Sequence, residues 1–314
     1  MRVTVAICTF NRAESLRRTL ESLARMQSAE IDWELVVVNN NCTDHTDAVI
    51  AGFANLLPIR REFEREPGQS NARNRAIEVA TGDYILWTDD DVIVDPGWLA
   101  AYANAFRSRP EAAVFGGPIR PKYESPAVKW IIDSERLLGG PYCIRDLGDA
   151  ATPLSVAGNR LPLGANFAIR TVEQRAFRYD PELGLTPLRQ RRGDEHDVIE
   201  RILQAGAIGY PVPGAIVEHC IGRERQTIDY LRRYYAGAGE QDAFVERYKG
   251  HGQRGPFWFG VPRWLWFGLV EGWLLYHLHR PLSPGPVWVR HLKLYAYASG
   301  AIQFWRRERR YARQ

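Results

Sequence analysis

Three aspartates stand directly after a short apolar run in the segment GDYILWTDDD, residues 82–91. The run from Tyr84 to Thr88 is aromatic and aliphatic, which is typical of a buried strand. Clustered carboxylates at the end of a strand repel one another unless a cation neutralises them. The segment therefore predicts either a cation site built from Asp89, Asp90 and Asp91 or a solvated acidic turn, and by itself it favours neither.

Strand-like and helix-like segments alternate on both sides of this run. Short β-branched runs indicate strands, whereas apolar residues three or four apart indicate amphipathic helices. The expected strands are residues 3–9, 33–38, 58–64, 84–88, 112–115 and 163–170, and the expected helices are 13–26, 46–54, 70–80, 98–108 and 197–205. Residues 121–163 are rich in loops, and two prolines in residues 208–217 favour an irregular or edge segment. This alternation favours an α/β fold with a parallel sheet that helices cover on both faces.

Polar residues follow three of the expected strands. They are Thr9, Asn11 and Arg12 after the first, Asn39 and Asn40 after the second, and the three aspartates after the fourth. In open α/β sheets, ligands bind beyond the carboxyl ends of the strands. We therefore expect these three groups to meet at one edge of the sheet.

Five blocks of the sequence resemble a known family when they are taken in order. They are VAICTFNR at 5–12, VVVNNNCTD at 36–44, GQSNARN at 68–74, GDYILWTDDD at 82–91 and GDEHDVIER at 193–201. Their order and spacing resemble the inverting family 2 glycosyltransferases of the GT-A type, and five ordered blocks are more specific than any one motif. The resemblance implies an α/β fold of Rossmann-like, GT-A type, with a mixed and mainly parallel sheet and flanking helices.

The resemblance also implies a binding site for a nucleotide-sugar donor. Its residues would be Thr9, Asn11, Arg12, Asn40, Arg73, Asp89 and Asp90. Asn40 would read the edge of the base, and Arg73 would approach the pyrophosphate, a task that suits a guanidinium fork. The family often has Asp at position 39 or 40, so the two asparagines leave the base undecided. The alternative for Arg73 is an exposed helix residue in an ion pair.

The same resemblance implies a divalent cation, Mg²⁺ or Mn²⁺. Asp91 would be its ligand, and His219 stands where related enzymes often have a further one. Carboxylate oxygens suit these hard cations, which bridge to diphosphate oxygens and keep several waters. A single histidine can equally well be structural, so this assignment has two readings.

An inverting transfer needs a base for the proton of the acceptor hydroxyl. In the family, this base is a carboxylate in a Gly-Glu-Asp-like motif, and here the acidic pair is reversed as Asp194 and Glu195. Position favours Glu195 and residue type favours Asp194; we expect Glu195 to act, although both acids could merely stabilise a helix N-terminus. Gly164, Ala165 and Asn166 resemble the acceptor side of the family, where small residues let a sugar approach.

The last part of the chain has a different composition. Of 314 residues, 45% are hydrophobic and the net charge is +4, yet residues 251–314 have ten Arg and Lys against two Glu and six of the ten tryptophans. We expect residues 1–250 to form the catalytic domain, with a donor half at about 1–120 and an acceptor half at about 121–250. Residues 251–314 would form a helical appendage that contacts a membrane peripherally or packs on the catalytic domain.

The sequence thus predicts sugar transfer from a nucleoside-diphosphate sugar to a hydroxyl of a glycan or lipid-linked acceptor. The alternatives are a nucleotidyltransferase and a non-catalytic glycan- or membrane-binding module with a degenerate site. Nucleic acid is not an expected partner, because the basic tail has no folded reader motif beside it. The four cysteines have no metal or disulfide spacing and no signal peptide is evident, so we expect a cytoplasmic protein at the cytoplasmic face of the membrane.

Overall fold

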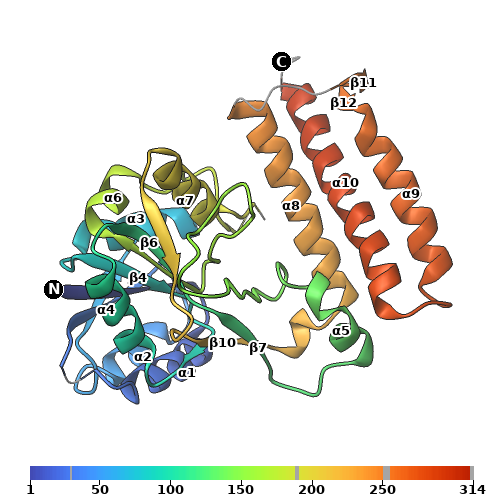
Figure 1. Ribbon diagram of the computed structural model, residues 1–314. Helices are drawn as coiled ribbons and strands as arrows, with labels where there is room; N and C mark the ends of the chain where they lie inside the picture. The colour runs from blue at the N-terminus through green and yellow to red at the C-terminus, as the bar shows by residue number, and fades with distance from the viewer. Residues whose placement is uncertain (29, 188–190, 250–254, 312–314) are drawn as a thin grey trace. The chain divides into compact units, whose positions relative to one another are not determined.

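The structure is a computed structural model that describes residues 1–28, 30–187, 191–249 and 255–311 (Figure 1). The chain forms two compact units. The first consists of residues 1–122, 143–184 and 193–220, and the second of residues 123–142, 185–192 and 221–314. The second unit thus contains residues on both sides of the expected boundary near residue 250, and that boundary stays a prediction about domains.

A seven-stranded sheet forms the centre of the first unit. Its order is β3-β2-β1-β4-β8-β6-β9. Four neighbouring strands, β3, β2, β1 and β4, are parallel, whereas β8 runs antiparallel to β4 and β6. The strands are β1 (Arg2–Thr9), β2 (Asp32–Asn39), β3 (Ile59–Phe63), β4 (Tyr84–Thr88), β6 (Ala112–Gly116), β8 (Asn166–Arg170) and β9 (Ile208–Pro211). The predicted mixed, mainly parallel α/β sheet is confirmed.

Two hydrophobic layers explain why the central strands are apolar on both faces. Val3, Val5 and Ile7 of β1 belong to one core cluster, whereas Ala6 belongs to the other, as period-two alternation requires. The first cluster includes residues of α1 (Ala13–Ala24), α2 (Thr46–Gly52) and α4 (Trp98–Ser108), and the second residues of α3 (Gln69–Val79) and α7 (Asp194–Gln204). Helices therefore cover both faces of the sheet, as the alternation predicted.

A second, smaller sheet and one short helix escaped the sequence patterns. The sheet has the order β5-β10-β7, with β5 (Val92–Val94), β10 (Val217–Ile221) and β7 (Ile119–Tyr123), and the helix is α6 (Thr171–Ala176). β10 pairs antiparallel with β5, which starts one residue after the aspartates. This pairing places the predicted His219 opposite Val92. The segment with two prolines contains β9 at the edge of the main sheet, which agrees with the expected edge segment.

Asn166 at the start of β8 is a buried polar junction of the first unit. Its Oδ1 accepts hydrogen bonds from Trp98 Nε1 at 2.8 Å and from the Tyr102 hydroxyl at 2.9 Å. Its Nδ2 donates to the carbonyls of Pro118 at 2.9 Å and Ala215 at 2.7 Å. The side chain thus joins α4 to two loops, and all four positions of its amide are used.

Three long helices dominate the second unit (Figure 1). α10 (Gly285–Tyr311) packs along both α8 (Ile228–Tyr248) and α9 (Arg263–His279). A Cβ at Gly239 would collide with the backbone of Tyr297, and one at Gly300 with that of Ala236, so glycine permits the close contact of α8 and α10. The shorter elements are α5 (Lys129–Ser134), η1 (Glu135–Leu137), η2 (Arg223–Arg225), β11 (Phe257–Trp258) and β12 (Val261–Pro262). Within the described residues, no helix has both the length and the apolar content needed to cross a bilayer.

Replacing the Asn166 junction should destabilise the first unit strongly. Asn166→Ala leaves the indole of Trp98, the hydroxyl of Tyr102 and two carbonyls without their buried partner, and each such loss costs about 1–3 kcal/mol. We expect the free energy of unfolding to fall by roughly 3 kcal/mol or more, as measured by urea denaturation. The exposed Asn55→Ala should change it by less than about 0.5 kcal/mol. Equal stability of the two variants would contradict the role of this junction.

Candidate functional site

The carboxyl ends of β1, β2 and β4 bring the predicted polar residues together. The backbone N–H of Asn40 donates to the carbonyl of Thr9 at 3.0 Å. The Thr9 hydroxyl donates to Asp90 Oδ2 at 2.7 Å, so the end of β1 contacts the residues after β4 directly. β1 lies between β2 and β4 in the sheet, which is why three segments distant in sequence share one edge.

Arg12 joins two of the three aspartates. Its Nη1 lies 2.7 Å from Asp90 Oδ1, and its Nη2 lies 2.7 Å from Asp91 Oδ2. Burial raises the pKa of Asp90 to about 6, against the opposing charge of Arg12. The Arg12 side chain remains 37% exposed, whereas those of Asp90 and Asp91 are almost fully buried. An anionic ligand could therefore reach the guanidinium of Arg12 from the solvent side.

Two residues that were predicted to bind the nucleotide-sugar donor hold loops of the site in place. The backbone of Asn11 has a φ of 52°, and its Oδ1 accepts a hydrogen bond from the N–H of Thr43 at 2.7 Å. The Asn40 side chain is buried and holds the loop after β3: its Nδ2 donates to the carbonyls of Glu64 and Glu66, and its Oδ1 accepts from the N–H of Gly68. In this structure, the amide of Asn40 is occupied by backbone groups. Its assignment to the base edge stays a prediction.

Arg73 of α3 lies at the centre of the acidic groups and is only 2% exposed. Its Nη1 donates to Asp194 Oδ2 at 2.7 Å and lies 3.6 Å from Glu195 Oε2. Its Nη2 lies 3.9 Å from Asp89 Oδ1. A carboxylate from the end of β4 and two from the start of α7 therefore face one guanidinium.

Aromatic rings enclose this guanidinium. Its carbon lies 5.3 Å from the ring centre of Tyr179 and 5.9 Å from those of Trp87 and Phe167. Although burial alone disfavours the charged form, Asp194 and the other anionic groups raise the pKa of Arg73 well above its usual value. The alternative of an exposed surface ion pair does not describe this environment. This enclosure could not be predicted, because Trp87 and Phe167 belong to expected buried strands and Tyr179 lies outside the expected strands and helices.

The N-terminus of α7 positions the predicted acidic pair. Gly193 precedes the helix with a φ of 77°, in the left-handed region that suits glycine, and both carboxylates lie in the first turn. The partial positive charge at a helix N-terminus favours carboxylates there. Asp197 of the same turn pairs instead with Arg201, through an Nε to Oδ2 hydrogen bond of 2.9 Å. Asp197 thus forms an ion pair with another residue of α7.

The two acids of the pair differ in exposure and in proton affinity. Burial raises the pKa of Asp194 to about 7. The positive charge of Arg73 opposes this rise, and the negative charge of Glu195 adds to it. Burial would also raise the pKa of Glu195, but His196 and Arg73 outweigh that effect and lower it to about 2. The Asp194 side chain is 2% exposed and that of Glu195 is 15% exposed. Glu195 is thus the ionised, reachable carboxylate, and Asp194 is the buried partner of Arg73.

The three residues predicted to lie on the acceptor side, Gly164, Ala165 and Asn166, have different surroundings. A Cβ at Gly164 would lie 3.0 Å from Arg73 Nη2 and 3.5 Å from Glu195 Oε1, so Gly164 lies against the acidic pair. Ala165 is fully buried, and its carbonyl accepts a hydrogen bond from the Thr88 hydroxyl at 2.9 Å. Asn166 is the buried junction described above. Of the three, the structure brings only Gly164 to the acidic pair, and the acceptor role of all three stays a prediction.

Asp91 and His219 are the residues that could hold a cation. His219 Nε2 lies 3.3 Å from Asp91 Oδ2, and both side chains are almost fully buried. Among the described residues, no group of three or more His, Cys, Asp or Glu side chains has the arrangement of a metal site. A carboxylate with an imidazole beside it fits a divalent cation that takes its remaining ligands from a diphosphate and water.

Sequence comparisons identify relatives of this chain. Residues 4–157 match the family model described as "Glycosyl transferase family 2". The succinoglycan biosynthesis protein ExoM of Rhizobium meliloti is 31% identical over 134 residues, which are 42% of this chain and 43% of that protein. The glucosyl-dolichyl phosphate glucuronosyltransferase of Haloferax volcanii is 29% identical over 126 residues, 39% of this chain and 40% of that protein. The chain therefore matches less than half the length of these curated relatives.

Solved structures of the same fold cover nearly the whole chain. Staphylococcus aureus TarS, residues 1–349, in complex with UDP-GlcNAc has a TM-score of 0.56 at 16% identity and covers 98% of this chain and 92% of its own. The mannosyltransferase PcManGT of Pyrobaculum calidifontis, in complex with GDP-Man and Mn²⁺, has a TM-score of 0.59 at 17% identity, covering 96% and 86%. At these identities the likeness shows the fold alone.

The raised pKa of Asp194 predicts a specific pH dependence of stability. An aspartate titrates near pH 4 when unfolded, so between that pH and about 7 the folded protein retains a proton that the unfolded chain releases. The contribution of Asp194 to stability is therefore fully present below pH 4 and is lost as the pH rises through 7. Asp194→Asn removes this titration, so the difference in Tm between wild type and variant should decrease from pH 5 to pH 8. A difference that stays constant over this range would contradict the assignment.

Proposed function

We propose that this chain, which belongs to glycosyl transferase family 2, transfers a sugar from a nucleoside-diphosphate sugar to an acceptor hydroxyl with inversion. The observation that carries the proposal is the position of Arg73, which faces Asp89 on one side and Asp194 with Glu195 on the other. A donor-side carboxylate and a candidate base thus lie around one buried cation. The family match favours this reaction over the alternatives of nucleotidyl transfer and a non-catalytic module.

Glu195 is the proposed general base. Its carboxylate takes the proton of the acceptor hydroxyl while the hydroxyl oxygen bonds to the anomeric carbon. The bond from that carbon to the diphosphate oxygen breaks, and its electron pair leaves with the nucleoside diphosphate. A low pKa does not prevent this step, because the hydroxyl proton becomes strongly acidic once the new bond to carbon forms. The low pKa keeps the Glu195 carboxylate ionised throughout the neutral pH range.

Asp194 acts through Arg73 in this proposal. It is buried and bonded to the guanidinium at 2.7 Å, so it has no path to an acceptor hydroxyl. Its carboxylate fixes the position of Arg73, which in turn fixes Glu195 and Asp89. Gly164 leaves space beside Arg73 and Glu195, where the reacting sugar could approach.

A divalent cation, Mg²⁺ or Mn²⁺, would be held by Asp91 and His219. When bound, it would supply positive charge beside the leaving diphosphate. The imidazole ligand favours Mn²⁺ of the two, since Mg²⁺ prefers oxygen ligands throughout. Arg12, already paired with Asp91, would lie next to the same diphosphate charge.

The proposed acceptor is a hydroxyl of a glycan or of a lipid-linked sugar. The relative ExoM is named for succinoglycan biosynthesis and the Haloferax volcanii relative for a glucosyl-dolichyl phosphate substrate. Both names support a role in the biosynthesis of polysaccharides or of the cell envelope. They concern proteins that this chain matches over less than half their length, so the acceptor of this chain is an open choice between the two.

The second unit supports peripheral membrane contact through residues 251–314. α9 buries Leu265, Gly268, Gly272 and Tyr276, whereas its other faces expose six large apolar side chains. The six are Trp264, Phe267, Val270, Trp273, Leu274 and Leu278. An exposed apolar surface of this kind marks an interaction site, and tryptophan favours the headgroup level of a bilayer.

The charge of this region supports one side of the membrane over the other. Residues 251–314 carry a local charge of +8, although Arg254 and Arg313 lie outside the described residues. Basic residues beside an apolar helix face favour the anionic cytoplasmic leaflet. The proposed location is therefore the cytoplasmic face of the membrane.

Release of nucleoside diphosphate tests the proposed reaction. The full chain incubated with Mn²⁺ and a panel of nucleotide-sugars should release nucleoside diphosphate from at least one donor, and chelation of the metal should abolish this release. Release of a sugar phosphate in place of nucleoside diphosphate would indicate nucleotidyl transfer, and absence of turnover together with absence of metal-dependent nucleotide binding would contradict the proposal.

Substitution of the acidic pair tests the assignment of the base. With the donor so identified, Glu195→Gln should lower kcat by about 10²–10⁴-fold while the donor KM changes little, because only the proton acceptor is lost. Asp194→Asn keeps an oxygen for Arg73 and should lower kcat less. The reverse order of the two variants would make Asp194 the base.

A further inference from the structure

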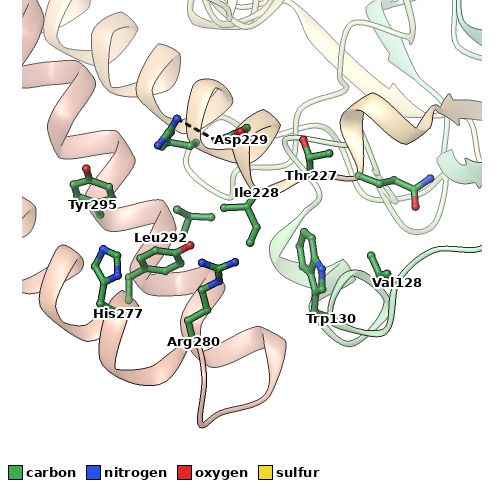
Figure 2. Close-up of a pocket in the computed structure, with 12 residues that line it drawn as sticks. Val128, Trp130, Thr227, Ile228, Asp229, His277, Arg280, Leu292 and Tyr295 are labelled. Atoms are coloured by element: carbon green, nitrogen blue, oxygen red, sulfur yellow. Dashed lines mark ion pairs between the residues drawn. The ribbon is translucent and has the colours of Figure 1, made fainter.

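An open trough lies in the second unit (Figure 2). It has a volume of about 620 Å³, which falls within the range of small-molecule sites. Its walls come from the start of α5, the start of α8, the C-terminal end of α9 and the first half of α10. The residues used below are Val128, Trp130, Ile228, Arg232, Arg280 and Leu292.

One side of the trough is apolar and firmly packed. The Trp130 ring lies 5.0 Å from that of Trp288, which lies 6.2 Å from the Tyr276 ring. Leu292 is buried, and Ile228 faces the same space from α8. The backbone of Trp130 also approaches Gly285 so closely that a Cβ there would collide with it. This wall is therefore preformed and suits an apolar chain or ring.

Two arginines supply the charge of the trough. Arg280 extends toward the space between Trp130 and Leu292 in Figure 2, and its guanidinium carbon lies 5.8 Å from the ring centre of Tyr276. Within the described part of the chain, Arg280 forms no ion pair. Arg232 pairs with Asp229 at 3.0 Å, and both side chains are more than half exposed. The lining of the trough thus contains one carboxylate and two guanidiniums, and this excess of positive charge favours an anion.

Exposed apolar side chains occur in the segments that supply this charged space, and one of them, Val128, lines it. Val128 is 50% exposed, Leu278 56% and Leu282 78%, and the last two flank Arg280 in sequence. Leu278 belongs to the exposed apolar surface of α9, and Leu282 follows the helix, which ends at His279. Arginine between leucines at a bilayer surface places its charge at the phosphates while its neighbours enter the apolar layer.

We infer that this trough binds the phosphate-bearing head of an anionic lipid, with Arg280 at the phosphate and the wall of Trp130, Ile228 and Leu292 against the apolar part. The inference rests on the proposed membrane contact and is independent of the transfer chemistry. Charge complementarity favours the phosphate, and the apolar wall of the trough favours the lipid. A free phosphate ion would use the arginines and leave the apolar wall without a partner.

Vesicle binding of paired charge variants tests the site. The full chain is sedimented with phosphatidylcholine vesicles that contain phosphatidic acid. Arg280→Gln should weaken binding about tenfold, the value of one lost charge-assisted contact. Arg290→Gln removes the same charge from an exposed position of α10 outside the trough and should weaken binding by less than about twofold. Equal losses would show diffuse attraction only and overturn the site.

Competition identifies the source of the phosphate. A soluble short-chain phosphatidic acid should release the wild-type chain from these vesicles, whereas inorganic phosphate at the same concentration should not. Release by inorganic phosphate would make the trough a simple anion site and overturn the lipid assignment. Arg280→Gln should retain the donor turnover of the wild type, so failure of the lipid site and failure of the proposed transferase reaction give different results. Failure of wild type to bind any of the vesicles would overturn both the trough and the membrane contact.

Discussion

Burial of the Arg73 guanidinium constrains the rest of the site, because a buried charge is stable only among partners that neutralise it. Asp194 at 2.7 Å, Glu195 at 3.6 Å and Asp89 at 3.9 Å supply that neutralisation. These residues come from α3, the end of β4 and the start of α7, so one ion cluster fixes three elements of the sheet edge. The carboxylates depend on Arg73 in return, since without it several negative charges would share a low-dielectric space.

Much of the first unit could be predicted because its signals are local. Buried strands and amphipathic helices leave their periods in the sequence, and the polar groups that follow three of the predicted strands meet at one edge of the sheet, as expected. The contacts of individual side chains were harder to predict. The acceptor-side assignment of Asn166 stays a prediction, whereas its four hydrogen bonds, which go to α4 and to two loops distant in sequence, could not be predicted. No motif encodes such partners.

The second unit was harder to predict for a different reason. α9 is apolar on nearly every side, so its sequence pattern has no clear helical period. The tight approach of α8 and α10 depends on Gly239 and Gly300, whose role appears only when the helices are placed together. Composition did locate the basic, tryptophan-rich region. Its apolar surface and the trough beside it emerged from the exposure of individual side chains.

A double-mutant cycle between Arg73 and Asp194 tests the central claim most directly. The free energy of unfolding is measured at pH 8 for wild type, Arg73→Met, Asp194→Asn and the double variant. Arg73→Met leaves buried carboxylates without their cation and should cost about 3–5 kcal/mol. The double variant should lose clearly less than the sum of the two single losses, by about 1 kcal/mol or more. Losses that add within about 0.5 kcal/mol would contradict the claim that these two residues hold the site together.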